Sequence, residues 1–279
     1  MAVPVCIATA QSLITPDVAA NGQHIRQLMT EARAAGARLL HLPEAALSGY
    51  AKAQIANWAE VDWPSVRHEL SAICATAREL DIWVVLGCNH QLTPPNRPHN
   101  SLYVISAAGD ITTRYDKRFC SHTEITDWYS PGNEAVVFDI DGVRFGCALC
   151  IEVQFPELFA ENARLGVECM LLSAYAQDPI FAVLAQAHAA TNNVWLSLAT
   201  PAQCGAALPS RFIGPDGNVL SCAPQGTEPC IILGSIDRDD ARFEVALTKA
   251  RPWRQVARQG EIYRSGVDGD PRSTNRTSF

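Results

Sequence analysis

Two cysteines three positions apart are the residues of this sequence that most directly suggest chemistry. Cys147 and Cys150 lie in FGCALCIEVQFPE, residues 145–157. If 143–150 is one strand, the odd spacing points the two side chains to opposite faces, so they could not readily form a disulfide or share a metal. A redox CxxC pair instead lies in the first turn of a helix, whereas the helix signal here begins only at Pro156. The spacing therefore favours one reactive cysteine over a pair.

A metal site remains an alternative interpretation of the same residues. His122-Thr123-Glu124 followed by Cys147 and Cys150 imitates the H-x-E…P-C-x-x-C pattern of zinc nucleobase deaminases. In that pattern His122, Cys147 and Cys150 would be zinc ligands, and Glu124 would shuttle the proton. Against it, Gly146 occupies the place of the proline, and the cysteines end a strand instead of opening a helix.

The main hypothesis assigns Cys147 to the core and Cys150 to catalysis. A cysteine on the turn after a strand can be exposed at the carboxyl end of a sheet, beside converging backbone N–H groups. The plain alternative is a buried hydrophobic cysteine. Glu44 and Lys117 favour chemistry, because each follows a strand-like run, RLLHLP and DITTRYD. A carboxylate beside a thiol can act as general base, and a lysine can neutralise an oxyanion, although either residue alone could be a solvated strand end.

These residues must be positioned by a mixture of strands and helices. Short apolar runs alternate with helical patterns, and Ala107-Ala108-Gly109 and Asp141-Gly142 are typical of hairpin turns. Such a mixture of βα units and hairpins predicts an α/β sandwich with mixed sheets. Strands are expected at 3–10, 37–44, 81–88, 100–106, 110–117, 135–140, 143–150, 167–174 and 194–200, with a hairpin at 210–222; helices are expected at 21–35, 64–79, from 156, and at 180–192.

Composition indicates one domain and excludes several partners. The chain has 279 residues, 48% of them hydrophobic, and a net charge of −7, without a basic stripe for nucleic acid. No apolar run reaches the ~18 residues of a membrane span, and MAVPVCIATAQ lacks a secretory signal pattern. Ten scattered cysteines are typical of a reduced, cytoplasmic protein. Residues 1–255 are expected to form the domain, and the polar residues 256–279 a tail that is disordered or crosses to a partner subunit.

Taken together, the ordered set resembles the carbon-nitrogen hydrolase superfamily, the nitrilase-like amidases. The resemblance covers roughly residues 3–255 and rests on Glu44 in LHLPEAALSGY, Lys117 in YDKRFC and Cys150 in GCALCIEVQFPE. It implies a four-layer αββα sandwich that pairs into homodimers through its helices. Further matches are Glu124 followed by Pro131-Gly132, FPE at 155–157, Asn192, and SRFIGPDG at 210–217.

The resemblance also implies a mechanism for small amide or N-carbamoyl substrates. Cys150 would attack the carbonyl carbon while Glu44 accepts its proton. Lys117 and the backbone N–H of Ile151 would hold the oxyanion, and Glu124 would position substrate and lysine. A lysine between two carboxylates stays charged, as this role requires. No metal or organic cofactor is implied.

Departures from the family pattern bear on the substrate. Nitrilases commonly carry Trp directly after the nucleophile, whereas Ile151 stands here, which favours amides over nitriles. The usual Arg-Ala-x-Glu-Asn run is HAATN at 188–192, so His188 and Thr191 replace an arginine and a glutamate. Their loss suggests a rewired ion pair and motivates a second alternative, a non-catalytic relative that binds a small molecule or a partner protein.

Four other features have mainly structural interpretations. Glu152 is expected to support the turn that carries Cys150. Trp128 and Tyr129 could line a substrate pocket or simply pack. His41 lies in an apolar strand and is expected to be a satisfied core histidine. The glycines of 214–217 form a turn, without the spacing of a phosphate-binding loop.

Overall fold

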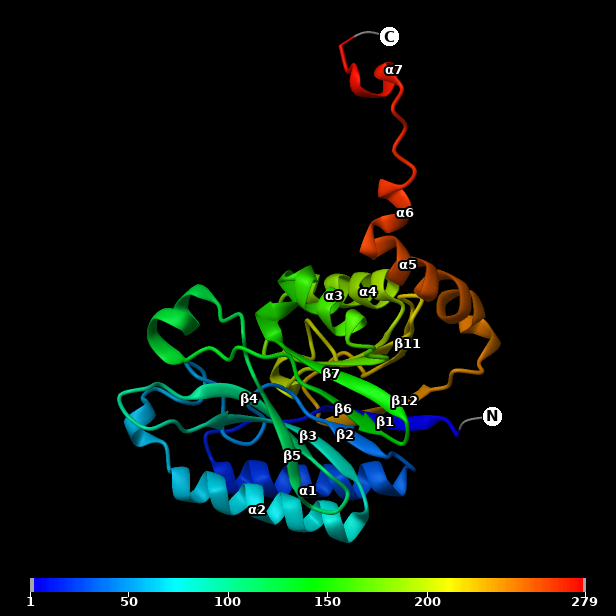
Figure 1. Ribbon diagram of the computed structural model, residues 1–279. Coiled ribbons are helices and arrows are strands. Elements are labelled where there is room, and N and C mark those ends of the chain that lie inside the picture. Colours follow the sequence, from blue (N-terminus) through cyan, green and yellow to red (C-terminus); the bar gives the residue numbers. More distant parts are fainter. Residues whose placement is uncertain (1–2, 278–279) are drawn as a thin grey trace.

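Two six-stranded sheets stacked face to face form the body of the protein. The structure is a computed structural model that describes residues 3–277. The strand orders are β12-β1-β2-β3-β4-β5 and β11-β10-β9-β8-β7-β6. Helices α1 and α2 cover the outer face of the first sheet, and α3 and α4 cover that of the second (Figure 1). The protein is therefore the four-layer αββα sandwich with two mixed sheets that the sequence predicted.

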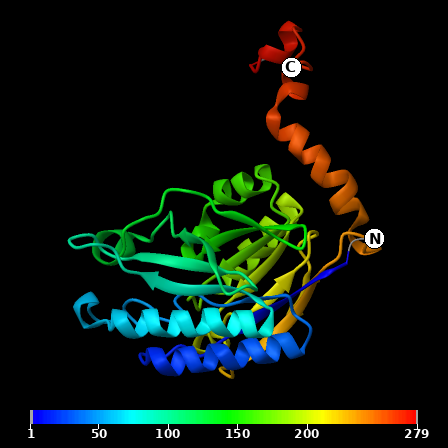
Figure 2. The ribbon, with the colours of Figure 1, turned by 60° about the horizontal axis from the view of Figure 1, so that its bottom comes forward.

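The first sheet is parallel at its centre and antiparallel toward its edges. The β1–β2 and β2–β3 pairs are parallel, and the β1–β12, β3–β4 and β4–β5 pairs are antiparallel. Figure 2 shows α1 and α2 side by side beneath it. The bounds are β1 Val5–Gln11, β2 Leu39–His41, β3 Trp83–His90, β4 His99–Ile105, β5 Ile111–Asp116, β12 Cys230–Ile236, α1 Val18–Ala34 and α2 Trp63–Leu80.

The second sheet has the same plan. Its β7–β8 and β8–β9 pairs are parallel, and the β6–β7, β9–β10 and β10–β11 pairs are antiparallel. The bounds are β6 Val137–Ile140, β7 Val143–Leu149, β8 Cys169–Ser173, β9 Trp195–Ala199, β10 Arg211–Ile213, β11 Val219–Cys222, α3 Pro156–Arg164 and α4 Ile180–Asn192. Short helices are η1 Trp58–Glu60, η2 Glu124–Trp128, η3 Cys150–Gln154, η4 Ala202–Cys204, η5 Ala241–Phe243 and η6 Val245–Ala250.

Most local predictions agree with these elements. The differences are that β12 and the helices after residue 250 were not predicted, and that β7 ends at residue 149 rather than 150. All three predicted hairpins are present, and Gly109, Gly142 and Gly217 adopt φ of 81°, 80° and 85°, a left-handed conformation that glycine tolerates. The stretch 118–133, for which no helix or strand was predicted, contains a π-helical turn at Glu124–Trp128. Its mixed polar and aromatic residues have no apolar period, so a single turn of this kind leaves no sequence signal.

The two cysteines of the opening motif lie in different parts of the core. Cys147 belongs to the cluster between the two sheets, and Cys150 belongs to the cluster under α3 and α4. Both thiols are free. The two cysteines are therefore separated, as predicted, but the predicted strand is one residue too long: β7 ends at Leu149, and Cys150 begins a short helix.

A buried polar chain joins the sheets beside the strand ends. His41 is fully buried, with Nδ1 2.8 Å from Ser197 Oγ and Nε2 2.8 Å from Ser173 Oγ. Ser197 Oγ lies 2.6 Å from Thr9 Oγ1. Burial lowers the pKa of His41 to about 3, so the ring is neutral. The prediction of a satisfied core histidine is confirmed.

The C-terminal residues leave the sandwich as helices. These are α5 (Arg251–Gln259), α6 (Glu261–Arg264) and α7 (Pro271–Thr274), which extend away from the body (Figures 1 and 2). The predicted boundary at 255/256 falls within α5. Arg254 NH1 donates to Ala190 O at 2.6 Å, so the first turn of α5 is tied to the end of α4. Among residues 3–277, no helix combines the length and apolar character needed to cross a bilayer.

Candidate active site

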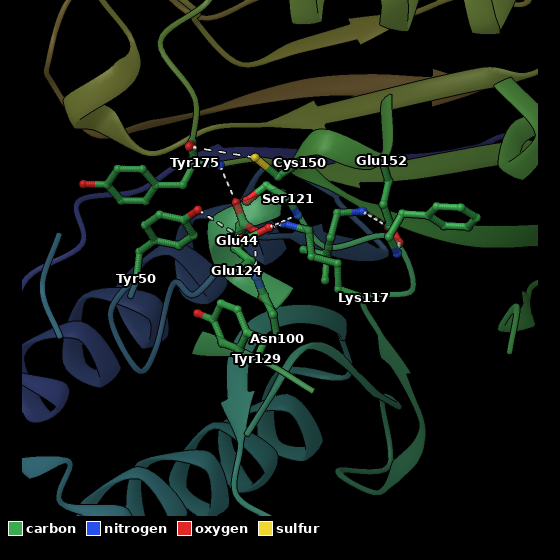
Figure 3. Close-up of polar contacts among 12 residues, drawn as sticks. Glu44, Tyr50, Asn100, Lys117, Ser121, Glu124, Tyr129, Cys150, Glu152 and Tyr175 are labelled. Carbon is green, nitrogen blue, oxygen red and sulfur yellow. Dashed lines mark hydrogen bonds and ion pairs between the residues drawn. The ribbon is translucent and has the colours of Figure 1, made fainter. Parts of the chain in front are cut away.

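Segments that follow three strands bring the candidate residues together. Lys117 follows β5 directly, Cys150 follows β7 directly, and Glu44 lies three residues after β2. Because β3–β4 and β4–β5 are both antiparallel, β5 runs in the same direction as β2, and their carboxyl ends lie at the same edge. Figure 3 shows the side chains of Glu44, Lys117, Glu124 and Cys150 converging at this edge.

Lys117 lies between two carboxylates. Its Nζ donates to Glu44 Oε1 at 3.0 Å and to Glu124 Oε1 at 2.9 Å, and all three side chains are at most 1% exposed. Desolvation alone would lower the pKa of Lys117, but the charges of Glu44, Cys150 and Glu124 raise it well above its ordinary value. The ammonium group therefore stays charged, with two of its three N–H donors engaged.

Glu44 is held by donors on both of its oxygens. Oε1 accepts from Asn100 Nδ2 at 2.7 Å in addition to Lys117, and Oε2 accepts from the Tyr175 backbone N–H at 2.8 Å. The side chain is fully buried. Its orientation is therefore fixed by three elements: β4, the residue after β5 and the segment after β8.

Cys150 adopts a strained backbone conformation beside this carboxylate. Its φ is 51°, in the left-handed region that non-glycine residues rarely occupy and that recurs at functional sites. Its Sγ lies 3.9 Å from the Tyr175 carbonyl oxygen, and the residue is 7% exposed. Burial and then Glu44 raise the pKa of the thiol well above its ordinary value, against a lowering by Lys117. The thiol is therefore neutral at neutral pH and needs a base to react.

Glu124 is the second carboxylate on Lys117. Burial works to raise its pKa, but Lys117 and the Ser121 backbone N–H hold it below its ordinary value. Oε2 accepts from Ser121 N at 2.7 Å, and Oε1 accepts from the Tyr50 hydroxyl at 3.2 Å. Glu124 is therefore an ionised anchor for the ammonium group.

Glu152 has the predicted structural role beside Cys150, and it also holds the segment that follows Lys117, which was not predicted. Its carboxylate accepts from the Tyr115 hydroxyl at 2.8 Å and from the backbone N–H groups of Leu149, Arg118 and Phe119. Burial nevertheless raises its pKa. One buried side chain thus ties the start of η3 in one half of the sandwich to the segment after β5 in the other.

The predicted aromatic pair makes packing contacts. Tyr129 is 1% exposed, and its hydroxyl donates to Asn89 Oδ1 at 3.0 Å. The ring centroids of Trp128 and Tyr129 lie 5.8 and 5.4 Å from that of Trp58. Contact of either residue with substrate stays a prediction.

A different aromatic pair, missed from the sequence, borders the cluster. Tyr50 and Tyr175 are half-buried and stacked with centroids 4.7 Å apart (Figure 3). Gln54 fixes the pair, because it donates to the Tyr175 hydroxyl at 3.0 Å and accepts from Tyr50 N at 3.0 Å. No period or motif distinguished these tyrosines in the sequence. Asn100 was also missed, although its alternation with Leu102 in β4 indicates that it faces inward.

The zinc alternative is wrong. Within residues 3–277, no group of three or more His, Cys, Asp or Glu side chains is arranged to hold a metal ion. His122 is exposed, whereas Cys147 is buried between the sheets. The sequence pattern failed because the strand geometry separates its two cysteines.

Fold and site together define a class: a four-layer αββα sandwich with an acid, a lysine and a thiol gathered at its strand ends. The family model of the carbon-nitrogen hydrolases matches residues 6–243. An (R)-stereoselective amidase of a Pseudomonas species is 30% identical, covering 75% of this chain and 72% of that protein. A hydrolase of Mycobacterium tuberculosis is 29% identical over 87% of this chain and 94% of its own length.

A solved structure shares the fold. It is a variant of the amidase of Nesterenkonia sp. AN1, described as carrying the acetamide moiety of fluoroacetamide on its active-site cysteine. It aligns with a TM-score of 0.77 at 23% identity, over 94% of this chain and 97% of that one. The chain belongs to the carbon-nitrogen hydrolase family. It is an amidase-type enzyme, and the alternative of a non-catalytic relative is not retained.

The departure at 188–192 has a structural counterpart. His188 Nε2 lies 2.8 Å from Val153 O, and the ring stacks on Phe159 with centroids 3.8 Å apart. Burial lowers the pKa of His188. A neutral hydrogen bond to η3 therefore occupies this position of α4, rather than an ion pair. Thr191 donates its hydroxyl to Ala187 O at 2.7 Å within the same helix.

Proposed function

We propose that the protein hydrolyses the carbon-nitrogen bond of small amides or N-carbamoyl compounds through a thioester on Cys150. The observation that carries this proposal is the buried Lys117 between Glu44 and Glu124, with the thiol against the same residue, Tyr175, that donates to Glu44. A charged lysine, a carboxylate and a neutral thiol are the three groups that acyl transfer needs.

In the first half of the reaction, Sγ of Cys150 bonds to the carbonyl carbon as its proton passes to Glu44. The carbonyl oxygen becomes an oxyanion, held by the third N–H of Lys117 and the backbone N–H of Ile151 in the first turn of η3. The C–N bond then breaks, and Glu44 gives its proton to the departing amine.

In the second half, Glu44 takes a proton from a water molecule as the water oxygen bonds to the thioester carbon. The C–S bond breaks, the carboxylic acid leaves, and the proton returns to the sulfur. Glu124 keeps Lys117 in place throughout. These side chains and water supply all the atoms, so the route uses no metal or organic cofactor.

Amides and N-carbamoyl compounds are favoured over nitriles as substrates. Ile151 in place of tryptophan after the nucleophile supports this preference. Amidase activity among the relatives, and covalent addition at the cysteine of the Nesterenkonia amidase, support the acyl-enzyme route. That Trp128 and Tyr129 line the substrate pocket remains a proposal.

The test is intact-protein mass spectrometry on rapidly quenched mixtures with a pool of small amides, nitriles and N-carbamoyl compounds. The wild type is expected to gain an acyl mass, and Cys150→Ala is expected to gain none. Cys147→Ala is the matched control, since it removes a neighbouring buried thiol from the other face of the strand, and it should still acylate. Hydrolysis of any of these compounds by Cys150→Ala at the wild-type rate would refute the thioester route.

We also propose that the enzyme is a cytoplasmic homodimer. All ten cysteines are free, which supports a reducing compartment. Val183 on α4 and Trp253 on α5 are 58% and 56% exposed, which supports an interface on this side of the molecule. The extended helices α5 to α7 are proposed to cross to the partner subunit.

A further inference from the structure

Asn100 makes the two oxygens of Glu44 inequivalent. Oε1 accepts two hydrogen bonds, from Asn100 Nδ2 at 2.7 Å and from Lys117 Nζ at 3.0 Å. Oε2 accepts one, from Tyr175 N at 2.8 Å. A carboxylate oxygen has about two lone-pair sites, so Oε1 is saturated and Oε2 retains a free site.

The free site lies on the side of the thiol. Tyr175 donates its backbone N–H to Oε2 and accepts from Cys150 Sγ through its carbonyl oxygen, at 3.9 Å. Figure 3 shows Cys150 and Tyr175 on one side of Glu44 and Asn100 on the other. Oε2 is therefore the oxygen of Glu44 that has a free acceptor site and shares a neighbour, Tyr175, with the thiol.

Asn100 is also built into the lysine side of the site. Its backbone carbonyl accepts the Lys117 N–H at 2.8 Å, so one residue of β4 fixes the main chain of Lys117 and the side chain of Glu44. Asn100 is fully buried, and within residues 3–277 its Oδ1 has no hydrogen-bond partner. An unsatisfied buried oxygen destabilises a fold, so the side chain of Asn100 contributes to the site through its donor and not through its acceptor.

We propose that Asn100 is a positioning residue that saturates Oε1 of Glu44 and so directs the Cys150 proton to Oε2. The inference rests on the proposed function for its catalytic meaning. Independently of that function, the amide N–H of Asn100 stabilises the Glu44 carboxylate and fixes the orientation of the carboxylate plane. The ionisable groups that interact with Glu44 are Lys117, Glu124, Cys150, Tyr50, Tyr129, Cys120 and Cys204.

The experiment measures alkylation of Cys150 by iodoacetamide as a function of pH, followed by peptide mass spectrometry. In this step the Sγ–C bond forms, the C–I bond breaks, iodide leaves and the thiol proton passes to Glu44. The probe is a small amide reagent, so the experiment does not depend on knowing the substrate. Cys150→Ala gives the background from the other cysteines.

We expect both Asn100→Ala and Asn100→Asp to shift the pH profile of alkylation, and Asn100→Asp to shift it further. Asn100→Ala removes one of the two donors to Oε1, so the acid limb of the alkylation profile should lie at a higher pH than in wild type. Asn100→Asp keeps the shape of the side chain but sets a carboxylate against Oε1, so its shift should be larger. The same order is expected in kcat for whichever amide of the pool the enzyme hydrolyses, with KM changed less than kcat.

Ser101→Ala is the matched control. Ser101 is the next residue of β4, is fully buried, and donates to Asp116 Oδ1 at 2.5 Å on the opposite face of the sheet. Its acid limb should coincide with that of wild type. An unchanged acid limb in both Asn100 variants, or an equal shift in Ser101→Ala, would overturn the inference.

The outcomes separate this inference from the proposed function. Shifted alkylation without hydrolysis of any pool compound would refute the proposed substrates and leave the role of Asn100 standing. Hydrolysis that requires Cys150, together with wild-type alkylation profiles in both Asn100 variants, would support the proposed function and refute the role of Asn100.

Discussion

At the scale of single residues, the site is a set of charges that can move a proton without changing their sum. The buried cluster holds two carboxylates and one ammonium, so one negative charge is in excess while the thiol of Cys150 is neutral. Releasing that proton to solvent would add a second negative charge in a poorly solvated place. Passing it to Glu44 leaves the total unchanged. This is why a thiol with a raised pKa is compatible with nucleophilic chemistry here.

Glu124→Gln tests the electrostatic part of this scheme. The variant keeps the size of the side chain but removes one of the two charges that hold Lys117. We expect kcat/KM to fall about 10- to 100-fold, and the free energy of unfolding at pH 7 to fall by about 1.5–3 kcal/mol, as for a hydrogen bond to a charged group. Steady-state kinetics and urea unfolding measure the two effects.

The stability effect should depend on pH with a definite sign. Lys117 holds the pKa of Glu124 below its ordinary value of 4.5 in the folded state. Its contribution is therefore present above pH 4.5 and is lost as the pH falls through the folded-state value. The gap in unfolding free energy between wild type and Glu124→Gln should close below pH 4.5. Glu161→Gln is the control, because Glu161 pairs with Arg118 but its side chain is 33% exposed. Its unfolding free energy should differ little from that of wild type at any pH.

The sequence predicted the charged members of the site but not their neutral partners. Glu44, Lys117 and Cys150 follow strands, and strand ends meet at sheet edges, so their proximity follows from order and topology. The contribution of Tyr175 comes from its backbone N–H and carbonyl, which every residue carries and no side-chain pattern marks. Asn100 differs, because alternation along β4 places its side chain on the same inward face as Leu102. The sequence did not show that its hydrogen-bond partner is Glu44.

At the scale of elements, short turns after strands hold the reactive groups. The sequence predicted the strands β1 to β11 and the helices α1 to α4, because apolar periods mark them, but not β12 or α5 to α7. The turns Glu124–Trp128 and Cys150–Gln154 were not separately predicted either. Their form depends on distant contacts. Gly87 in β3 is an example: a Cβ there would lie 2.0 Å from Pro43 O and 2.6 Å from Ala45 N. Only glycine lets the segment carrying Glu44 lie this close to the strand.

Gly87→Ala should therefore damage both stability and activity. The added methyl group must displace Pro43 to Ala45, which we expect to lower the unfolding free energy by about 3 kcal/mol, and to reduce kcat about 100-fold through misplacement of Glu44. Thermal melting and kinetics check this. Gly269→Ala, where an added Cβ meets no atom within 4 Å, is the control. Wild-type kcat in Gly87→Ala would contradict the role given to this contact.

At the scale of the whole molecule, one side of the sandwich carries exposed apolar side chains next to an extended tail. Ile180 and Val183 on α4 are 41% and 58% exposed, and Trp253 and Val256 on α5 are 56% and 44% exposed. A stable dimer typically buries about 800 Å² on each partner, an area that two helices and a tail can supply. The sequence predicted the pairing only through resemblance, since exposure of these residues requires the fold.

Val183→Glu together with Trp253→Glu should convert the enzyme to monomers. Two carboxylates placed in an apolar interface lose their hydration without gaining partners. Light scattering after gel filtration should give about twice the chain mass of 30.3 kDa for wild type and the chain mass itself for the variant. Ile111→Glu changes a similarly exposed residue on the edge strand β5 and should stay dimeric. A monomeric wild type would refute the dimer.

The polar chain from Thr9 through Ser197 and His41 to Ser173 has a consequence for how this architecture can vary. Apolar contacts are non-directional, so on their own they would specify the register between the two sheets only weakly. Hydrogen bonds at fixed donor and acceptor positions remove that freedom, since a shift of one residue breaks them all. These four hydrogen-bonded side chains thus fix the register of one sheet on the other. Because these hydrogen bonds fix the position of one sheet relative to the other, surrounding loops can change in length and composition while the distance between Glu44 and Cys150 is preserved.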